Sequence, residues 1–391
     1  MTLQEKVGSL GLYLHVPFCA TTCDFCTFYQ EAPQRQQIDQ YLDALETEMR
    51  TVGTDEPIET VFFGGGTPGL LMGRDFEKIF TALHKHFRFD PSEISVELAP
   101  STVRGDKLKV LRDLGVTRVS MGVQSFDPQT LVALGRQQSP KLVYEAYDSL
   151  RSAGFDNINI DLMFAYPGQT PAVWEADMRE ALRLDPEHIS TYCLTFEEDT
   201  ALWVKLNEGK LRRDIGVETE LYRQTWDFLP DNGYAQYEVS NFSKPGFECQ
   251  HNISTWQMGQ WIGLGPSAAS QYAGWRWSNP ADLKEWQEAI QKRATADGAF
   301  TEHAVDVTEL SPELLATDAV IFGLRMNDGI DLDAIKKRWP EAVGVIEEIG
   351  EILCRFDNEG LLKRSANVYR CTDEGRLRVD AIGGELISCS A

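Results

Sequence analysis

Three cysteines within eight residues form the part of the chain whose residue types and spacing most clearly permit chemistry. They stand in the segment Cys19-Ala-Thr-Thr-Cys23-Asp-Phe-Cys26, a C-x3-C-x2-C pattern that directly follows an apolar run. Because the loop is short, bringing the three thiols to one metal centre costs little chain entropy. Iron–sulfur clusters are held by cysteine thiolates, usually four. A [4Fe–4S] cluster held by only three would leave one iron open to a substrate or cofactor, as in catalytic metal sites.

Two other uses of these cysteines fit the pattern less well. A zinc site takes four nitrogen or sulfur ligands, often as two spaced pairs. The remaining cysteines are isolated, at Cys193, Cys249, Cys354, Cys371 and Cys389. A thioredoxin-like motif uses C-x-x-C alone, so Cys19 would be surplus. The spacing therefore favours a cluster.

Polar residues are also predicted where later strands end. The glycine run Gly64–Gly66, followed by Thr67-Pro68, stops an apolar stretch. Glycines let a backbone approach a ligand closely, and their exposed N–H groups can bind a carboxylate. Three further strand patterns end in or contain Glu97, Gln124 and Asp161, and Arg136 follows the second of them. For any one of these side chains taken alone, a salt bridge at a strand end is the favoured explanation.

Strand and helix patterns alternate through the first half of the chain. Apolar strands are predicted at Leu12–Val16, Ile58–Phe63, Ile94–Leu98, Arg118–Val123, Ile158–Phe164 and His188–Leu194. Helices are predicted at Gln36–Val52, Asp75–Phe87, Lys107–Leu114, Pro140–Ala153 and Ala172–Leu184. This alternation is typical of βαβ units in a parallel sheet. Because six repeats are too few for a closed eight-stranded barrel, we predict an α/β fold with an open, partial (β/α)6 barrel over residues 1–200, and a site at the carboxyl ends of its strands.

The second half of the chain differs in character. Residues 201–307 are predicted as a β-rich extension and connecting region outside the barrel, with a helix at Val217–Leu229 and β elements at Tyr234–Phe242 and Trp275–Trp277. Several tryptophans crowd this region and favour either a flat apolar slot for a planar ligand or ordinary packing. They are Trp256, Trp261, Trp275, Trp277 and Trp286.

Residues 308–391 are predicted as a C-terminal α+β module that resembles a winged helix. The pattern has helices at Thr317–Leu324, Leu332–Trp339 and Val343–Phe356, a hairpin of Gly360–Arg364 and Asn367–Cys371, and a last helix at Asp373–Val379. Glutamates at positions 341, 347, 348 and 351 make this module acidic. Since acidic surfaces repel phosphate backbones, we expect a lid or docking module and not a DNA-binding one.

Composition sets broader limits on the function. The 391 residues carry a formal net charge of −23, which disfavours nucleic acid as a partner. The sequence has no run of eighteen apolar residues that would indicate a transmembrane segment, and no secretory signal pattern at its start. Eight cysteines without a disulfide framework indicate a reducing, cytoplasmic location.

The cysteine pattern after a first strand resembles the radical S-adenosylmethionine (SAM) superfamily. In that family the open iron of a [4Fe–4S] cluster binds the amino and carboxyl groups of SAM, and an electron from the cluster cleaves SAM to a 5′-deoxyadenosyl radical. The resemblance implies that Cys19, Cys23 and Cys26 are the metal ligands. The chemistry belongs to the cofactor, so no catalytic side chain is predicted.

The same resemblance assigns SAM contacts to the strand-end residues. SAM offers an ammonium, a carboxylate and ribose hydroxyls. The implied contacts are Gly65, Gly66 and Thr67 at the amino group, Glu97 at the ammonium or a ribose hydroxyl, Arg136 at the carboxylate, and Gln124 and Asp161 at ribose hydroxyls.

A set of segments is similar to one subfamily, which contains oxygen-independent coproporphyrinogen III oxidase and the HemW-type heme chaperones. The segments are Tyr13–Cys19, Gly64–Pro68, Ser120–Phe126, Leu134–Arg136 and Asp161–Gln169. The match covers roughly residues 11–270, and the C-terminal part also fits the group. The similarity to this subfamily adds Tyr13 to the predicted cofactor-binding residues.

Three features favour the HemW type over the oxidase. The oxidase has a fourth cysteine where this chain has Phe28, and a longer segment ahead of the cluster than the 18 residues present here. The HemW type has His-Asn-x-x-Tyr-Trp preceded by a cysteine, and this chain has Cys249-Gln-His251-Asn252-Ile-Ser-Thr255-Trp256. The chain departs from its relatives at Thr255, at Ala269, where they usually carry histidine, and at Ala99, where they commonly carry asparagine.

The resemblance leaves the function open between two main alternatives. A heme chaperone would bind heme or another tetrapyrrole and pass it to an acceptor protein, with His251 as the leading axial ligand, since imidazole is a common heme ligand. A histidine held by a core hydrogen bond is the alternative for that residue. A coproporphyrinogen III oxidase would decarboxylate two propionate side chains. A third alternative is an enzyme that acts on another tetrapyrrole. An electron donor is an expected partner for each of these functions.

Overall fold

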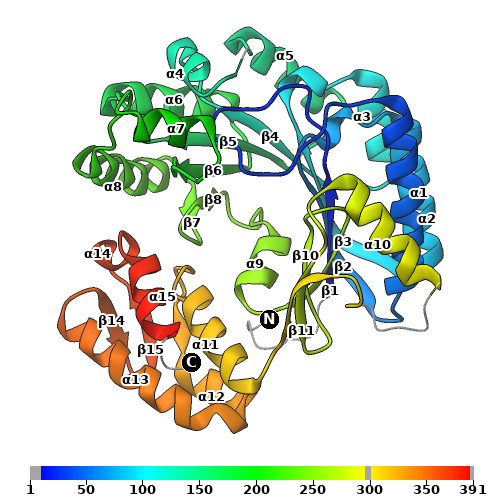
Figure 1. Ribbon diagram of the computed structural model, residues 1–391. Helices are drawn as coiled ribbons and strands as arrows, with labels where there is room; N and C mark the ends of the chain where they lie inside the picture. Colours follow the sequence, from blue (N-terminus) through cyan, green and yellow to red (C-terminus); the bar gives the residue numbers. More distant parts are fainter. Residues whose placement is uncertain (1–9, 137, 296–300, 388–391) are drawn as a thin grey trace.

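The molecule is built around one large sheet whose centre is parallel. The structure, a computed structural model, describes residues 10–136, 138–295 and 301–387, so Cys389 lies outside it. Twelve of the described strands form this sheet in the order β12-β11-β10-β9-β1-β2-β3-β4-β5-β6-β8-β7 (Figure 1). Strands β1 to β6 run parallel and follow one another in chain order. This confirms the predicted α/β fold with six successive parallel strands.

The six predicted strands and five predicted helices of the first half all occur. The strands are Leu10–Val16 (β1), Pro57–Gly65 (β2), Arg88–Leu98 (β3), Arg118–Gln124 (β4), Ile158–Phe164 (β5) and His188–Cys193 (β6). The helices are Arg35–Val52 (α1), Gly73–His86 (α2), Gly105–Asp113 (α3), Pro128–Ala133 (α4), Pro140–Ser152 (α5) and Pro171–Leu184 (α6). Strand β3 begins six residues before its predicted start, and the short helix α4 was not predicted.

Local sequence signals explain where the outer helices begin and end. Helices α5 and α6 each start with a hydroxyl residue followed by proline: the side chains of Ser139 and Thr170 accept the amide hydrogen bonds of Leu142 and Val173. Helix α5 ends before Gly154, which has a φ of 86° that glycine adopts without strain. The apolar faces of these helices then cover the outer face of the sheet.

Residues 201–307 add strands to both sides of the parallel core, beyond its six successive strands. Strand β9 (Gln260–Leu264) pairs parallel with β1, followed outward by β10 (Ala269–Tyr272), β11 (Trp275–Ser278) and β12 (Val305–Glu309). On the other side, β8 (Asn241–Ser243) pairs antiparallel with β6, next to β7 (Ala235–Gln236). The pattern of short apolar runs did not indicate which partner strand each would take.

Four helices also lie in the described part of this connecting region. They are Ala201–Asn207 (α7), Ile215–Asp231 (α8), Gln250–Trp256 (α9) and Leu283–Thr295 (α10). Helix α8 contains the predicted Val217–Leu229 segment. The stretch from Cys249 to Trp256 is thus a short helix, and α9 contacts β2 and β9. Figure 1 shows α9 between the sheet and the C-terminal module.

The C-terminal module has its own apolar core. Its elements are Pro312–Gly323 (α11), Ile330–Asp331 (β13), Leu332–Arg338 (α12), Val343–Asn358 (α13), Leu362–Ser365 (β14), Val368–Cys371 (β15), Asp373–Arg376 (α14) and Val379–Ile387 (α15). Apart from Val239, the buried residues of this core come from positions 316–386. The predicted three helices and hairpin are confirmed, while α15 was missed. We retain the division into 1–200, 201–307 and 308–391 as a proposal, supported on the C-terminal side by this separate core.

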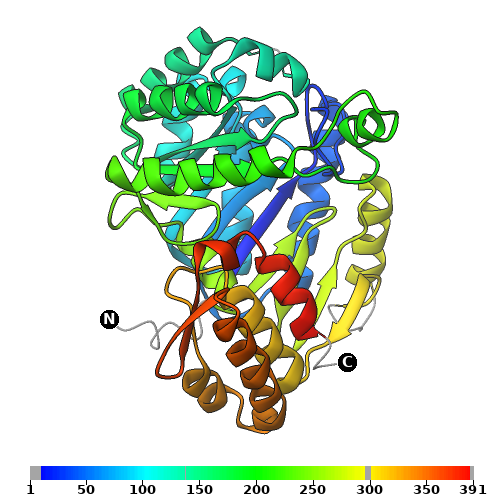
Figure 2. The same cartoon turned by 90° about the vertical axis from the view of Figure 1, so that its left-hand side faces the viewer.

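The module is attached to the segment around β7 and to α9. The Asn327 amide donates to the Tyr237 carbonyl at 3.0 Å, and the Val239 amide donates to the Arg325 carbonyl at 3.1 Å. The Arg338 guanidinium donates to the carbonyls of Gln257 and Met258, just beyond α9, at 2.8 and 2.7 Å. Figure 2 shows the module below the sheet in a second view. No helix of the described segments is both long and apolar enough to cross a membrane.

A buried carboxyl group holds the loop after β9 against helix α1. Glu48 is 1% exposed, and its two oxygens accept hydrogen bonds from the Gly265 amide and the Asn279 side chain, both at 2.7 Å. Gly265 in turn lies against the His15 carbonyl, close enough that a Cβ at Gly265 would collide with it. Burial raises the pKa of Glu48 to about 7 in spite of these donors. The loop after β9 is therefore fixed beside the end of β1 by a group that titrates near neutrality.

We expect Glu48→Gln to stabilise the protein more at pH 8 than at pH 5. The folded pKa near 7 lies above the ordinary value of 4.5, so the folded state holds the proton more tightly and the free energy of unfolding falls as pH rises between these values. Glutamine cannot ionise, which removes a penalty of up to about 3 kcal/mol at high pH. Thermal unfolding at pH 5 and pH 8 measures the difference, with the exposed Glu77→Gln as control. An equal effect at both pH values would contradict the prediction.

Candidate functional site

The three cysteines of the first motif lie in a loop at the carboxyl end of β1, beside α4 and α7. The Cys19 amide donates to the Glu31 carbonyl at 3.0 Å, and the Cys26 amide donates to the Cys23 carbonyl at 3.2 Å. In the middle of the loop, Asp24 donates to the Leu134 carbonyl and accepts from the Leu202 amide, at 3.1 and 2.9 Å. Cys19, Cys23 and Cys26 are free and partly exposed thiols. The backbone thus fixes the loop and leaves its thiols available.

The electrostatics around these thiols suit a centre that supplies positive charge. Burial raises the pKa of Cys19, and the other two sulfurs add to this rise. The Thr67 hydroxyl, 3.3 Å from the Cys19 sulfur, has the opposite effect and lowers the pKa. Burial also raises the pKa of Cys26. Within the described residues, no group of His, Cys, Asp or Glu is arranged to hold a single metal ion. A cube cluster makes a different demand, because each thiolate binds its own iron, and the bound iron favours the ionised thiol.

The glycine run connects the end of β2 to the cysteine loop. Gly65 has a φ of 97°, and a Cβ at Gly66 would lie 2.7 Å from the Phe18 carbonyl. The amides of Gly66 and Thr67 donate to the carbonyls of Val16 and Phe18 at 2.8 and 2.7 Å. These two amides are therefore engaged, which corrects the expectation that they are exposed donors for a carboxylate. The Thr67 carbonyl accepts from the Leu70 amide at 2.9 Å, so the Gly66 carbonyl is the one of the two that could accept from an ammonium.

Two carboxyl groups approach each other inside the barrel. Burial, and then the neighbouring Asp161, raise the pKa of Glu97 to about 8, although the Gly65 amide donates to it. Burial also raises the pKa of Asp161. Tyr13 lies on the same side, because a Cβ at Gly64 would be 3.1 Å from its ring and 3.3 Å from a Glu97 oxygen. The repulsion that Asp161 exerts on Glu97 favours a cation or hydroxyl groups as ligands here.

Gln124 and Arg136 meet at the end of β4. Gln124 is 9% exposed and has a φ of 70°, a conformation that costs a residue other than glycine free energy and is often found at functional sites. The Arg136 Nη1 donates to the Gly122 carbonyl at 2.9 Å, and its Nε is buried without a hydrogen-bond partner among the described residues. A guanidinium that is fixed on one side and unsatisfied on another is suited to bind an anion.

The structure thus brings the predicted cluster and SAM residues to one end of the barrel, but places His251 elsewhere. His251 is 8% exposed, and its Nδ1 lies 2.9 Å from the Thr60 hydroxyl in the lower half of β2. Its amide donates to Glu93 at 3.2 Å, and Phe62 packs against its ring at a centroid distance of 5.5 Å. Burial lowers the pKa of His251 to about 4, so the imidazole is neutral at pH 7, with Nε2 as the nitrogen left for an iron.

The tryptophans of residues 256–286 do not form one slot. Trp277 and Trp286 are 2% and 0% exposed, and Trp286 packs against Tyr41 of α1 at 5.6 Å between ring centroids. Trp256 packs against Phe322 of the C-terminal module, with the Arg325 guanidinium 5.0 Å from its ring. For these three residues, the structure supports ordinary packing, which is one of the two alternatives that the sequence left open.

Several polar residues of the barrel interior were missed by the sequence reasoning. The Ser120 hydroxyl and the Asn159 amide donate to Asp161 at 3.1 and 2.7 Å, and His188 lies 2.6 Å from Asn159. A signal was present, because polar residues alternate with apolar ones in β4, β5 and β6, which places them on the inner face. We missed this alternation because the apolar residues dominate the composition of these strands.

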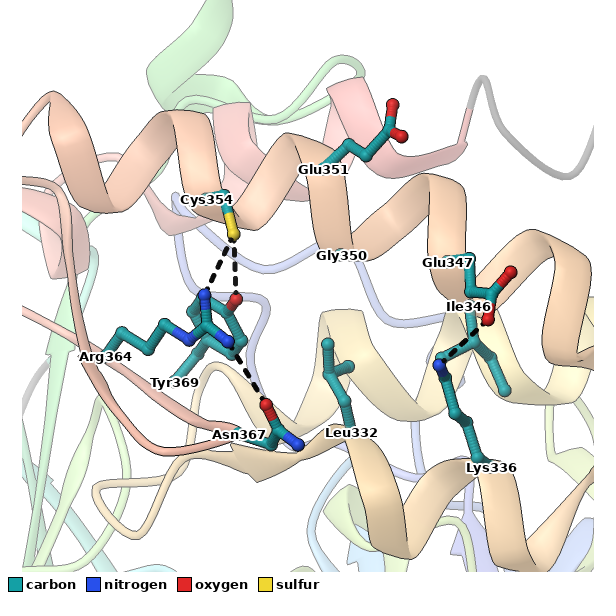
Figure 3. A pocket seen from close by; sticks show the side chains of 10 residues that line it. All are labelled: Leu332, Lys336, Ile346, Glu347, Gly350, Glu351, Cys354, Arg364, Asn367 and Tyr369. Carbon is teal, nitrogen blue, oxygen red and sulfur yellow. Dashed lines mark hydrogen bonds and ion pairs between the residues drawn. The ribbon is translucent and has the colours of Figure 1, made fainter.

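A surface pocket of about 430 Å³ lies in the C-terminal module, away from the cysteine loop (Figure 3). In it, Cys354 contacts the Tyr369 hydroxyl at 3.1 Å and accepts a hydrogen bond from Arg364 at 3.4 Å. Lys336 is paired with Glu347 at 3.3 Å. This mixture of paired charges does not define a ligand, but it makes Cys354 a suitable control thiol.

Comparisons with known proteins agree with the site. Residues 13–181 match the model of the radical SAM superfamily, and residues 310–378 match that of the HemN C-terminal domain. The fold resembles the solved coproporphyrinogen III oxidase (HemN) from Escherichia coli, a radical SAM enzyme, with a TM-score of 0.82 and 25% identity over 97% of this chain and 90% of that one. Fold and thiol loop together define a radical SAM protein, and this class implies a [4Fe–4S] cluster and SAM.

Sequence relatives narrow the class further. Heme chaperone HemW of Bacillus subtilis is 33% identical over 96% of this chain and 98% of its own length. Heme chaperone HemW of Lactococcus lactis is 32% identical over 93% of each chain. The chain belongs to the HemW family of radical SAM proteins.

We expect each of the substitutions Cys19→Ala, Cys23→Ala and Cys26→Ala to abolish the cluster. Reconstituted wild type should hold about four irons per chain, because a cube has four and loses its hold on the protein when one of only three thiolates is removed. Iron content and visible absorbance after anaerobic reconstitution measure this. Cys354→Ala is the control and should keep the cluster. Full retention in Cys23→Ala would contradict the assignment.

We expect Arg136→Ala and Asp161→Asn to weaken SAM binding while the cluster stays in place. Losing a charged hydrogen bond to the ligand should raise the dissociation constant about 10- to 100-fold. The measurement is the change in the reduced cluster's spectrum as SAM is added. Arg179→Ala, on the outer helix α6, is the control. SAM affinity equal to wild type in both variants would place the SAM site elsewhere.

Proposed function

We propose that this chain binds a [4Fe–4S] cluster and SAM at the carboxyl ends of its parallel strands, and that it handles heme as a HemW-type chaperone. The observation that carries the proposal is the meeting, at one end of the barrel, of the thiol loop, the glycine run and the carboxyl pair of Glu97 and Asp161. The heme part rests on the names of the relatives, which align with nearly the whole chain.

The described side chains suit the groups that SAM presents. The Gly66 carbonyl and the Glu97 carboxylate can accept from the ammonium, while Arg136 can donate to the carboxylate. Asp161 and Gln124 can bind the ribose hydroxyls. The bound cofactor supplies the redox chemistry, and the chain's part is to bind, orient and exclude water. The two partners that this function requires are an electron donor and a heme-acceptor protein.

His251 is our candidate for the heme ligand. Thr60 engages its Nδ1, and a metal-bound histidine commonly gives its second nitrogen to such a partner. Its low exposure means that heme would reach Nε2 only if α9 shifts from the sheet. Thr255, in place of the tyrosine of its relatives, uses its hydroxyl to donate to the His251 carbonyl at 3.0 Å within α9.

A coproporphyrinogen III oxidase is the second candidate, and the similarity to the solved oxidase favours it. Against it stands Phe28, which occupies the place of the oxidase's fourth cysteine and is 57% exposed near the thiol loop. We therefore expect heme binding by the reconstituted protein and no conversion of coproporphyrinogen III to protoporphyrinogen IX.

We expect His251→Gln and His251→Ala to weaken heme binding, since either change removes the imidazole, and glutamine retains a polar partner for Thr60. The measurement is a heme titration followed by absorbance, with the exposed His84→Ala as control. SAM binding should not change. Unaltered heme affinity would move the ligand elsewhere, and turnover of coproporphyrinogen with matching SAM cleavage would make the protein an oxidase.

A further inference from the structure

We infer that Tyr237 is a positioning residue for SAM, which acts through His188 and Asn159 on the carboxylate of Asp161. Tyr237 lies outside the parallel strands, in the segment between β7 and β8 to which the C-terminal module is attached. The inference rests on the proposed SAM site, and it assigns a role to residues that no sequence motif singled out.

The first part of the argument is the support of Asp161. One of its oxygens accepts from the Asn159 amide at 2.7 Å, and the other accepts from the Ser120 hydroxyl at 3.1 Å. The same Asn159 amide group also donates to Ser120 at 2.7 Å. Asn159 is 1% exposed, so its orientation is decided by these partners, by His188, and by Ser190, whose hydroxyl donates to the Asn159 oxygen at 3.1 Å. The direction of the Asp161 carboxylate therefore depends on how Asn159 is turned.

The second part of the argument concerns the series of hydrogen bonds that runs from Asp161 through Asn159 and His188 to Tyr237. Each hydrogen bond in this series can have only one direction. An ionised carboxylate can only accept, so Asn159 must face Asp161 with its NH2 group and turn its oxygen to His188, 2.6 Å away. His188 must then donate from Nδ1. Burial keeps this imidazole neutral by lowering its pKa, so Nε2 carries no proton and can only accept.

The third part is Tyr237, which closes the series. Its hydroxyl lies 2.8 Å from His188 Nε2 and must donate to it. The lone pairs of the same hydroxyl accept from the Cys249 amide, at the start of α9, at 3.3 Å. By donating to Nε2, the hydroxyl stabilises the His188 tautomer that carries its proton on Nδ1, and through it the orientation of Asn159. Hydrogen bonds aligned in one direction polarise and strengthen one another.

Tyr237 also joins parts of the molecule that are far apart in the sequence. Its carbonyl accepts from the Asn327 amide of the C-terminal module, while its hydroxyl contacts both the barrel interior and α9. Glu93 fixes the same end of α9 from within the barrel, accepting from the amides of Gln250 and His251 at 2.9 and 3.2 Å. A ligand that orders Asp161 will therefore favour the seating of α9 and of the module, and the effect is reciprocal.

The test is a double-mutant cycle on SAM affinity in the reconstituted full chain. Tyr237→Phe removes only the hydroxyl, and we expect it to weaken SAM binding about 3- to 10-fold. In an Asp161→Asn background the same change should cost less than about 2-fold, because a residue that acts through Asp161 has nothing left to orient. A general structural role would give equal effects in both backgrounds.

Tyr234→Phe is the matched control. It removes the hydroxyl of a buried tyrosine just before β7, one that donates to the Pro186 carbonyl at 2.6 Å and takes no part in the series. We expect it to leave SAM affinity unchanged in both backgrounds. His188→Gln interrupts the series at its centre and should reproduce the non-additive result, even if Tyr237→Phe fails to fold.

A second readout follows the coupling itself. In the wild type, SAM should slow hydrogen exchange at the amides of Cys249 and Asn327, and in Tyr237→Phe this slowing should disappear. Additive losses, or SAM-dependent protection that persists in Tyr237→Phe, would overturn the inference and leave the proposed function intact. A wild type that binds no SAM would overturn both.

Discussion

Each parallel strand of the barrel turns one face to the outer helices and the other to the interior, and the polar groups on that inner face need partners because water is largely excluded from it. In β1 the outer positions are Leu10, Leu12 and Leu14, all fully buried, while the inner positions are Gly11, Tyr13 and His15. The same alternation places Glu93, Ser120 and Asn159 inside. Satisfying these groups determines how the amino ends of the strands are closed and how the residues at the carboxyl ends are oriented.

Helix α9 and Glu93 close the lower end of the barrel, which is the end where the parallel strands begin. The carboxylate of Glu93 is 5% exposed and receives the first amides of α9 as well as the Cys249 thiol at 3.5 Å. At the upper end, where the parallel strands finish, the amides of Gly66 and Thr67 bind the cysteine loop to the residues after β2. The two ends therefore differ in kind: backbone hydrogen bonds shape the upper end and leave side chains available, whereas the lower end is filled by side chains that satisfy one another.

The sequence allowed us to locate residues at the upper end of the barrel, but it gave almost no indication of which residues lie at the lower end. Cys19, Gly65, Glu97 and Arg136 could be placed because each lies at or after the end of a recognisable strand, and the carboxyl ends of parallel strands meet at one edge. Glu93 and Tyr237 gave no such signal, because their partners are 157 and 49 positions away in the chain. Strand β9 was missed for the same reason: a five-residue apolar run does not specify whether it joins an edge or a neighbour far back in the sequence.

The pairing of β9 with β1 has a consequence for how the chain is made. Leu10 aligns with Gln260 and Leu14 with Leu264, so one side of the first strand waits for a partner that leaves the ribosome roughly 250 residues later. At 5–20 residues per second, the interval is about 10–50 s. During it, β1 is an apolar strand with an unpaired edge, the kind of edge that pairs with other chains. We therefore expect the growing chain to be exposed to aggregation until β9 emerges and covers this edge.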